Sequence, residues 1–167
     1  KEAYRILCKA YTSALYEFIG EALTTGNFCL IESYLTVFFE NHQKYSNDAE
    51  VRYPNYELPV YRGASRYNPG DLKLNAIRYW PNFSSTSRDY DAAFGFARGV
   101  CLYKIYLTNK NSPVSHISLP SNDKGWSYYP YEEELTLLPF FHFMVLEIEK
   151  KEGEGEPLTI TIAEMPY

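Results

Sequence analysis

The apolar residues change their spacing near residue 58, and this change divides the chain into a helical part and a β part. Over residues 3–25 and 28–43 they recur every three or four positions, as in amphipathic helices. Gly26 stands where the first of these helices should end. After a polar loop at 44–58, short runs rich in β-branched and aromatic residues predict strands. We expect the first helix to bury one stripe of residues, namely Leu7, Ala10, Ala14, Leu15, Phe18, Ala22 and Leu23.

Turn residues and alternation give the expected elements of the β part. A short helix is expected at 71–79, and another from Asp89 to Phe96 with Ser87 as its N-cap and Gly99 as its end. Because the sequence shows neither an internal repeat nor a domain linker, we predict one domain over 1–167. It would have a helical lead-in at 1–45 and a mainly β core at 58–167. The fold class is therefore α+β, with a largely antiparallel sheet. Strands are predicted at 60–64, 80–87, 100–107, 114–119, 132–138 and 158–162, and the segment 140–150 continues the β part.

Charge and cysteine content argue against several classes of function. The 16 basic and 21 acidic residues give a net charge of −5, whereas a protein that binds a nucleic-acid backbone needs a basic stripe. The three cysteines form no CxxC or CxxH pattern, so we expect neither a zinc site nor a disulfide framework. Cys8 and Cys29 lie in apolar-patterned segments and are expected to be core thiols. No apolar run reaches the length of a membrane span.

An arginine interrupts the apolar strand predicted at 60–64. A buried guanidinium needs an anionic partner, and its planar fork suits a bidentate phosphate or carboxylate. Arg62 therefore forms either an internal salt bridge or part of a site for an anionic ligand. Gly63 removes a side chain where a ligand could approach the backbone.

Two further segments carry side chains that could take part in binding or catalysis. Phe83-Ser-Ser-Thr-Ser87 places hydroxyls at the end of a strand, where they can cap a helix or orient a carboxylate. In an extended Glu132-Glu133-Glu134, the first and third side chains share a face and lie about 6–7 Å apart. Such a pair can stabilise a developing positive charge and accept a proton, although a glutamate run can also be a solvated edge.

With these segments in this order, the chain resembles the arginine-specific mono-ADP-ribosyltransferases, whose hallmark is an Arg, a Ser-Thr-Ser and a Glu-x-Glu. The resemblance covers residues 60–165 and includes the Leu-rich run into Pro139-Phe140. It implies that the helices precede a split β-sandwich with NAD held in a cleft between two sheets. This run differs from the commoner Val-Leu-Ile-Pro-Pro of the family only in core residues.

The resemblance implies roles for the residues of the three segments. Arg62 would bind the NAD phosphates, and Gly63 would offer its backbone to the nicotinamide amide. Ser85 would hold the catalytic Glu134 in place, and Glu132 would serve an arginine acceptor. NAD would be a co-substrate, and no metal is expected.

Aromatic residues complete the implied site. Tyr61 is counted with the NAD-binding residues. Phe94 and Phe96 are both candidates to stack on nicotinamide, and Phe96 is favoured. Tyr129 and Trp126 would be exposed aromatics that recognise the target protein. The implied partner is a protein that presents an arginine, with no nucleic acid and no membrane involved.

We expect the enzyme to be a monomer, and enzymes of this kind are found among toxins. A cytosolic site of action, native or after delivery into a host cell, is favoured because the cysteines do not match the disulfide pattern of secreted vertebrate members. Three alternatives remain open: an NAD glycohydrolase on the same fold, a non-catalytic binding module, and a carbohydrate-active carboxylate pair. Presence of Arg62, Ser85 and Glu134 together argues against the binding module.

Overall fold

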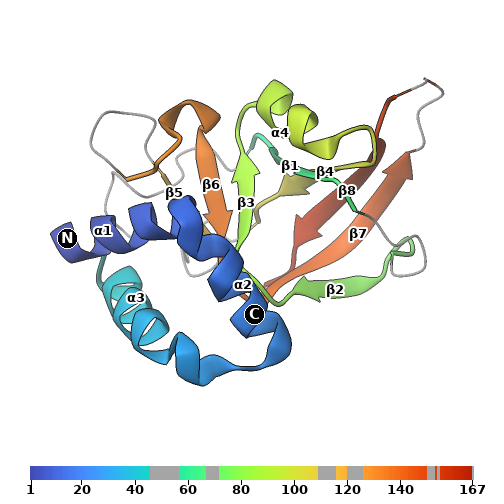
Figure 1. The fold of residues 1–167 in the computed structure, drawn as a ribbon. Helices are drawn as coiled ribbons and strands as arrows, with labels where there is room; N and C mark the ends of the chain where they lie inside the picture. Colours follow the sequence, from blue (N-terminus) through green and yellow to red (C-terminus); the bar gives the residue numbers. More distant parts are fainter. Residues whose placement is uncertain are drawn as a thin grey trace.

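Three helices come first in the chain, and eight strands in the described residues form one sheet after them (Figure 1). The computed structural model describes residues 1–45, 57–66, 72–108, 116–119, 126–149, 153 and 155–166. Two predicted segments lie wholly or mostly outside these residues, namely the turn that the sequence Tyr67-Asn-Pro-Gly70 predicts and the loop at 44–58. The helices are α1 (Glu2–Ala10), α2 (Tyr16–Thr25), α3 (Glu32–Tyr45) and, between two strands, α4 (Tyr90–Ala97).

The helix expected over 3–25 is broken in the middle. Tyr11–Leu15 forms a π-helical turn between α1 and α2, and Ser13 lies outside helical geometry at φ −97° and ψ −128°. The hydroxyls of Thr12 and Ser13 donate to the carbonyls of Lys9 and Ala10. Such side-chain bonds compete with the regular backbone pattern of a helix. Gly26 ends α2 in the left-handed conformation, at φ 72°, as expected.

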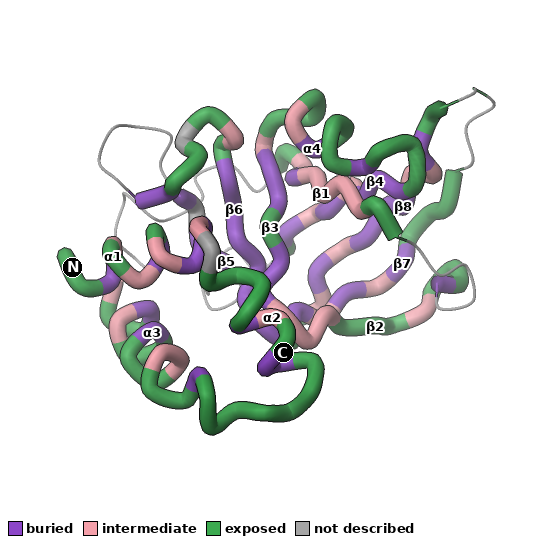
Figure 2. The backbone as a smooth tube through the Cα atoms, viewed as in Figure 1, coloured by how far each residue is buried: buried purple, intermediate pink, exposed green. Residues whose placement is uncertain are grey.

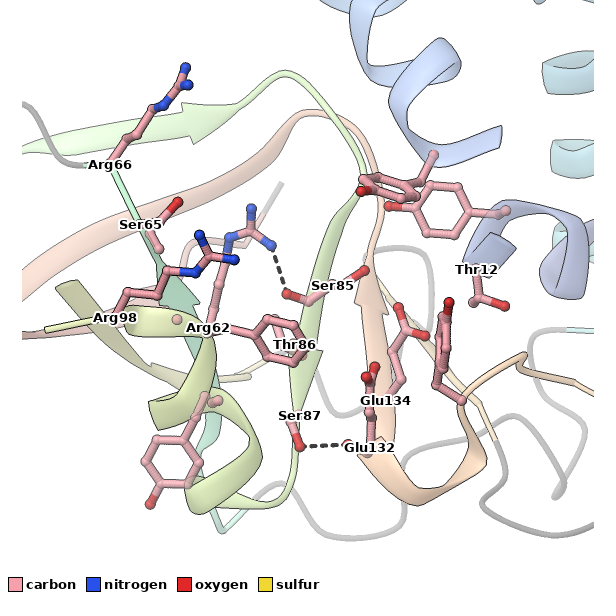
Figure 3. Close-up of a pocket in the computed structure, with 18 residues that line it drawn as sticks. Thr12, Arg62, Ser65, Arg66, Ser85, Thr86, Ser87, Arg98, Glu132 and Glu134 are labelled. Atoms are coloured by element: carbon pink, nitrogen blue, oxygen red, sulfur yellow. Dashed lines mark hydrogen bonds between the residues drawn. The ribbon is translucent and has the colours of Figure 1, made fainter. Parts of the chain in front are cut away.

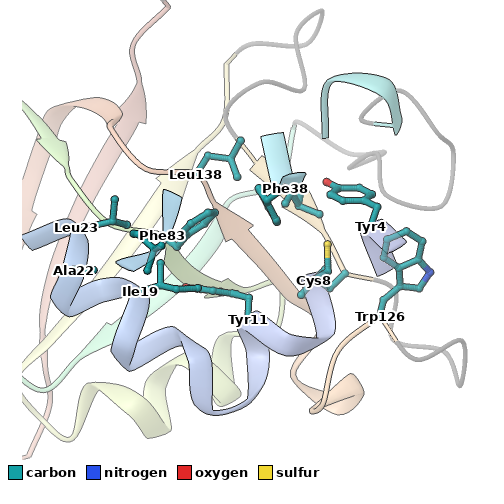
Figure 4. Close-up of a cluster of buried hydrophobic side chains, with 13 residues drawn as sticks. Tyr4, Cys8, Tyr11, Ile19, Ala22, Leu23, Phe38, Phe83, Trp126 and Leu138 are labelled. Atoms are coloured by element: carbon teal, nitrogen blue, oxygen red, sulfur yellow. The ribbon is translucent and has the colours of Figure 1, made fainter. Parts of the chain in front are cut away.

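The break changes which side chains of the first two helices are buried. Leu15 and Phe18 were expected in the core, but they are 39% and 45% exposed. Cys8 is a core thiol as predicted, whereas the prediction for Cys29 is wrong because it lies exposed after α2. The core on this side packs the helices against Ile117 of strand β5 (His116–Ser118), and against Phe83 and Leu138, which adjoin strands β3 (Ser84–Ser87) and β6 (Glu134–Leu137) (Figure 4). From α1 to α2 it contains Tyr4, Cys8, Tyr11, Ile19, Ala22 and Leu23.

The sheet has the order β2-β7-β8-β4-β1-β3-β6-β5. Among the described pairings only β4 with β8 is parallel, so the sheet is largely antiparallel as expected. Figure 2 shows that β6 is buried along its length, whereas the edge strand β2 is mostly exposed. The strands are β1 (Val60–Ala64), β2 (Ile77–Trp80), β3 (Ser84–Ser87), β4 (Cys101–Tyr106), β5 (His116–Ser118), β6 (Glu134–Leu137), β7 (Phe141–Glu149) and β8 (Leu158–Glu164).

The sheet divides between β1 and β3. These neighbours share one register pair, Tyr61 with Ser87, while β1 and β4 share five. Leu135 and Leu137 of β6 nevertheless pack in the same apolar cluster as Phe143 of β7, so the two parts of the sheet fold towards each other. This is the split sandwich, and the polar segments of the sequence lie at its division.

Two local predictions in this region are wrong. Residues 77–79, expected to end a helix, belong with Trp80 to β2, which pairs with β7. The strand expected over 80–87 is interrupted after Trp80, because Pro81 lacks the N–H that a continuous ladder requires, and β3 starts at Ser84. No helix in the described part of the chain is both long enough and apolar enough to span a membrane.

Candidate active site

A cleft of about 800 Å³ opens where β1 and β3 separate (Figure 3). Its volume lies within the range of roughly 300–1,000 Å³ that is typical of ligand sites. The helical part, the strand ends and the turn before β6 all contribute to it. Its lining includes Tyr11, Thr12, Tyr16, Tyr61, Arg62, Gly63, Arg66, Ser85, Thr86, Ser87, Phe96, Arg98, Tyr129, Glu132 and Glu134.

Arg62 projects from β1 into this cleft. Its Nη1 donates to the carbonyl oxygen of Ser85 over 2.7 Å, and its guanidinium carbon lies 5.5 Å from the centre of the Trp80 ring. Among the described residues, no carboxylate forms an ion pair with Arg62, so the internal salt bridge is not seen there. Burial lowers the pKa of this guanidinium. A partly desolvated cation without a paired anion favours an anionic ligand.

Glu134 is the first residue of β6 and is only 5% exposed. Thr136 Oγ1 donates to its Oε1 over 3.1 Å. Burial raises the pKa of the Glu134 carboxyl and the charge of Glu132 adds to this, while the hydroxyls of Ser85, Thr136 and Ser127 act in the opposite direction. Ser85 reaches the cleft from β3, as Figure 3 shows. The site therefore holds a buried carboxylate surrounded by hydroxyl donors.

Glu132 lies in the cleft lining with Glu134, but the two are not on one strand. Pro130–Glu132 is a 3₁₀ turn, Glu133 has a left-handed backbone with φ 45°, and β6 begins only at Glu134. The expected extended arrangement of the three glutamates is therefore wrong. Burial raises the pKa of Glu132, and Glu133 is exposed to solvent. The turn, rather than strand alternation, brings both carboxylates into the cleft.

Gly63 lies where α4 crosses β1. A Cβ atom at this position would lie 2.1 Å from the carbonyl oxygen of Ala93 and 2.3 Å from the nitrogen of Ala97. The missing side chain thus makes room for the helix, and not for a ligand as expected, although the Gly63 backbone lines the cleft.

The aromatic residues of this wall separate into two groups. Phe96, at the end of α4, lines the cleft and is 55% exposed. Phe94 is absent from the lining and stacks on Tyr90, at 5.8 Å between ring centres. Tyr61 lines the cleft and meets Tyr90 edge to face at 5.3 Å.

The aromatic residues before the glutamates do not behave alike. Tyr129 is 43% exposed and lines the cleft. Trp126 was expected to be exposed too, but it is 1% exposed and packs edge to face on Tyr4 of α1. The prediction that Trp126 is an exposed recognition residue is therefore wrong, because its large apolar ring fills the core beneath the helices.

Several lining residues were not anticipated from the sequence. Tyr11, Thr12 and Tyr16 come from the broken helix, and no simple sequence signal announces that break. Arg66 and Arg98 are exposed arginines on the same side of the cleft as Arg62, and the carboxylates of Glu132 and Glu134 lie on the other (Figure 3). Arg66 follows Arg62 by four residues, and this spacing was the available signal. The cleft is thus positively charged on one wall and negatively charged on the other.

Comparison with known proteins places this fold among ADP-ribosyltransferases. No protein-family model matches the chain, and no curated protein matches its sequence. The Vis toxin, an ADP-ribosyltransferase from Vibrio splendidus, is 16% identical with a TM-score of 0.68, over 99% of this chain and 74% of that one. An ADP-ribosyltransferase from Clostridium botulinum is 14% identical with a TM-score of 0.73, over 98% and 87%. Exoenzyme S from Pseudomonas aeruginosa, in a complex with human 14-3-3 protein beta and carba-NAD, is 18% identical with a TM-score of 0.69, over 98% and 74%. The expected α+β fold of this class is confirmed.

Proposed function

We propose that this chain is an NAD-dependent mono-ADP-ribosyltransferase that moves ADP-ribose from NAD to a protein side chain, with arginine as the acceptor. One observation carries the proposal: Arg62, Ser85 and Glu134, which are far apart in the sequence, line a single cleft in a fold of this class. A chain that only used the fold as a scaffold would not require all three groups there. The single domain over 1–167 and the monomeric state stay predictions.

The cleft suits NAD in its distribution of charge. The guanidinium of Arg62 can bind the pyrophosphate through its planar fork, and Arg66 and Arg98 add positive charge at the same wall. Phe96 and Tyr61 offer flat apolar faces on which a nicotinamide ring can stack. The Gly63 backbone provides polar groups beside them. We therefore assign the nicotinamide ring to the wall of Phe96 and Tyr61, with the attached ribose towards Glu134.

The chemistry requires a fixed negative charge near the ribose. The bond between ribose C1′ and the nicotinamide nitrogen breaks, and its electron pair leaves with nicotinamide, which departs as a neutral molecule. No strong general acid is needed, and the positive charge that develops on the ribose resembles that of glycoside hydrolysis. Glu134, held by hydroxyl donors in a buried position, stabilises this charge. Removing such a preorganised group typically costs about 10²–10³ in rate.

Glu132 supplies the second function of the site. A guanidinium is a poor nucleophile while it is protonated, so its proton must be removed as the new bond forms. Glu132 lies in the lining near Glu134, and burial raises its pKa, which makes it a better proton acceptor than an exposed carboxylate. Glu132 then accepts the proton, and the guanidine nitrogen bonds to ribose C1′.

The test is incubation of the protein with labelled NAD and a cell lysate. We expect label on protein that neutral hydroxylamine releases, and we expect its loss in Glu134→Ala. Glu132→Gln should abolish transfer but leave NAD hydrolysis measurable. Glu147→Gln, an exposed change on β7 outside the cleft, is the matched control.

The glycohydrolase and the binding module predict different outcomes. Free ADP-ribose with no labelled protein would indicate an NAD glycohydrolase. Absence of both NAD binding and turnover in the unmodified protein would favour a binding module and overturn the proposal. Equal loss of both activities in Glu132→Gln would remove the separate role of Glu132. We also predict that the protein acts in a cytosol, either native or after delivery into a host cell. This assay does not test that prediction.

A further inference from the structure

The turn that carries Glu132 is attached to the end of β3. The hydroxyl of Ser87 donates to the carbonyl oxygen of Glu132 over 2.6 Å (Figure 3). The same hydroxyl accepts from the backbone N–H of Asp89 over 2.9 Å, at the start of α4. Ser87 is 6% exposed, so water competes little for these bonds. One buried hydroxyl thus ties the backbone of Glu132 to the end of β3.

Arg88 holds the next residue of the same turn. Its backbone N–H donates to the carbonyl oxygen of Glu133 over 3.3 Å, and its Nε lies 3.7 Å from Glu133 Oε2. That Nε is buried and has no hydrogen-bond partner in the described residues, so the ion pair with Glu133 orients it. Glu133 has φ 45°, in the left-handed region that residues other than glycine seldom adopt. Ser87 and Arg88 therefore hold a strained residue from both sides.

Glu134 is held separately from this turn. Its carbonyl oxygen accepts from Leu119 N over 2.9 Å, and its side chain accepts from Thr136. Its backbone also belongs to the β3–β6 ladder, where it faces Ser87. Because these contacts do not involve the turn, the position of Glu132 can change while Glu134 keeps its place.

We propose that Ser87 and Arg88 are positioning residues for Glu132, and that they set the share of ADP-ribose passed to a guanidine instead of water. This inference rests on the proposed function and concerns how its site divides ADP-ribose between the two acceptors. Cleavage of the bond to nicotinamide is common to both routes. In transfer, the guanidine nitrogen bonds to C1′ and its proton passes to Glu132. In hydrolysis, a water oxygen bonds to C1′ and its proton passes to solvent. A displaced Glu132 leaves the guanidinium protonated, so water reacts instead.

The experiment measures both products from one reaction. Purified protein is supplied with NAD and agmatine, a small amine that carries a guanidine group, and ADP-ribosyl-agmatine and free ADP-ribose are quantified together. Ser87→Ala should lower the ratio of transfer to hydrolysis about tenfold, since a small misplacement of a reacting group is costly. Ser87→Thr keeps the hydroxyl and should restore most of the ratio. Glu133→Gln, an exposed change, should lower it by a smaller factor.

A matched control removes a similar bond elsewhere. The Thr108 hydroxyl donates to the Glu164 carbonyl oxygen over 3.0 Å, outside the cleft, and Thr108→Val should leave the ratio unchanged. An unchanged ratio in Ser87→Ala, or an equal fall of both products, would overturn the inference while the proposed function stood. An unmodified protein that forms neither product would overturn both. If Ser87→Ala does not fold, the ratio in Glu133→Gln decides.

Discussion

A methyl group at Gly63 should separate α4 from β1. With ideal geometry on the present backbone, the new Cβ would lie 2.1, 2.3 and 2.7 Å from backbone atoms of Ala93, Ala97 and Phe96, and all three distances are below the 3.0 Å that real Cβ contacts reach. Backbone atoms of a helix cannot rotate away, so the helix itself must move. Overpacking typically costs about 1–3 kcal/mol, and the upper end applies here. For a chain of this size, about 3 kcal/mol corresponds to a melting point roughly 6–12 °C lower.

Thermal unfolding followed by circular dichroism checks this value, and the KM for NAD should rise because Phe96 moves with the helix. Gly95→Ala in the same helix is the control. A Cβ there meets nothing within 4 Å. Alanine is favoured over glycine in helices by about 1 kcal/mol, so the melting point should hold or rise. A Gly63→Ala melting point within about 2 °C of the unmodified protein would refute the close approach of α4 to β1.

Three other predictions concern the cleft and its surroundings. Phe96→Ala should raise the KM for NAD about tenfold through lost stacking, and Phe94→Ala should change it less than about twofold; equal effects in steady-state kinetics would contradict the assignment of Phe96. Trp126→Ala should lower the free energy of unfolding by about 3–5 kcal/mol in urea titrations, and a loss below about 1 kcal/mol would argue against burial of this ring. Burial raises the pKa of Glu134 in the folded state, so the folded state binds this proton more tightly and stability is lost as pH rises from the unfolded pKa through the folded one. Glu134→Gln removes that loss and should melt higher than the unmodified protein at pH 7.5 but not at pH 4; the same difference at both values would contradict the linkage.

The residues of the cleft could be predicted because few residue types perform each task. An arginine inside an apolar strand, such as Arg62, must find an anion or an array of acceptors. A carboxylate at the head of a leucine run, such as Glu134, must be met by donors. These requirements hold whichever way the chain folds, and the structure brings both residues to one cleft. Helix ends marked by glycine, such as Gly26, are local in the same way.

Choices between two equivalent local partners could not be predicted. Ser87 and Asp89 can each cap α4, and the structure uses Asp89, whose carboxylate accepts from the N–H groups of Asp91 and Ala92. Ser87 instead donates to Glu132, a partner 45 residues away in the sequence. Only the pairing of β3 with β6 brings that carbonyl within reach. The left-handed turn at Glu133 depends on the same pairing.

Trp126 shows a second reason why parts of the structure could not be predicted from the sequence. Its polar surroundings in the sequence indicated an exposed loop, but exposure depends on what lies above a side chain. The ring is covered by Tyr4, which α1 brings from the other end of the described chain. Likewise, the break at Tyr11–Leu15 arises from hydroxyl bonds that a periodic pattern does not register.

The central position of β8 has a consequence for synthesis. β8 lies between β7 and β4, and among the described strands no other pairing joins β2 and β7 to the part of the sheet that contains β1, β3 and β6, whose residues line the cleft. While a ribosome is still translating the residues before Leu158, the nascent chain lacks this link. The Trp80 ring beside Arg62 belongs to the unlinked pair of strands, so the arginine wall of the cleft stays incomplete. We therefore expect the proposed activity to appear only after translation of β8, and not gradually as the chain emerges.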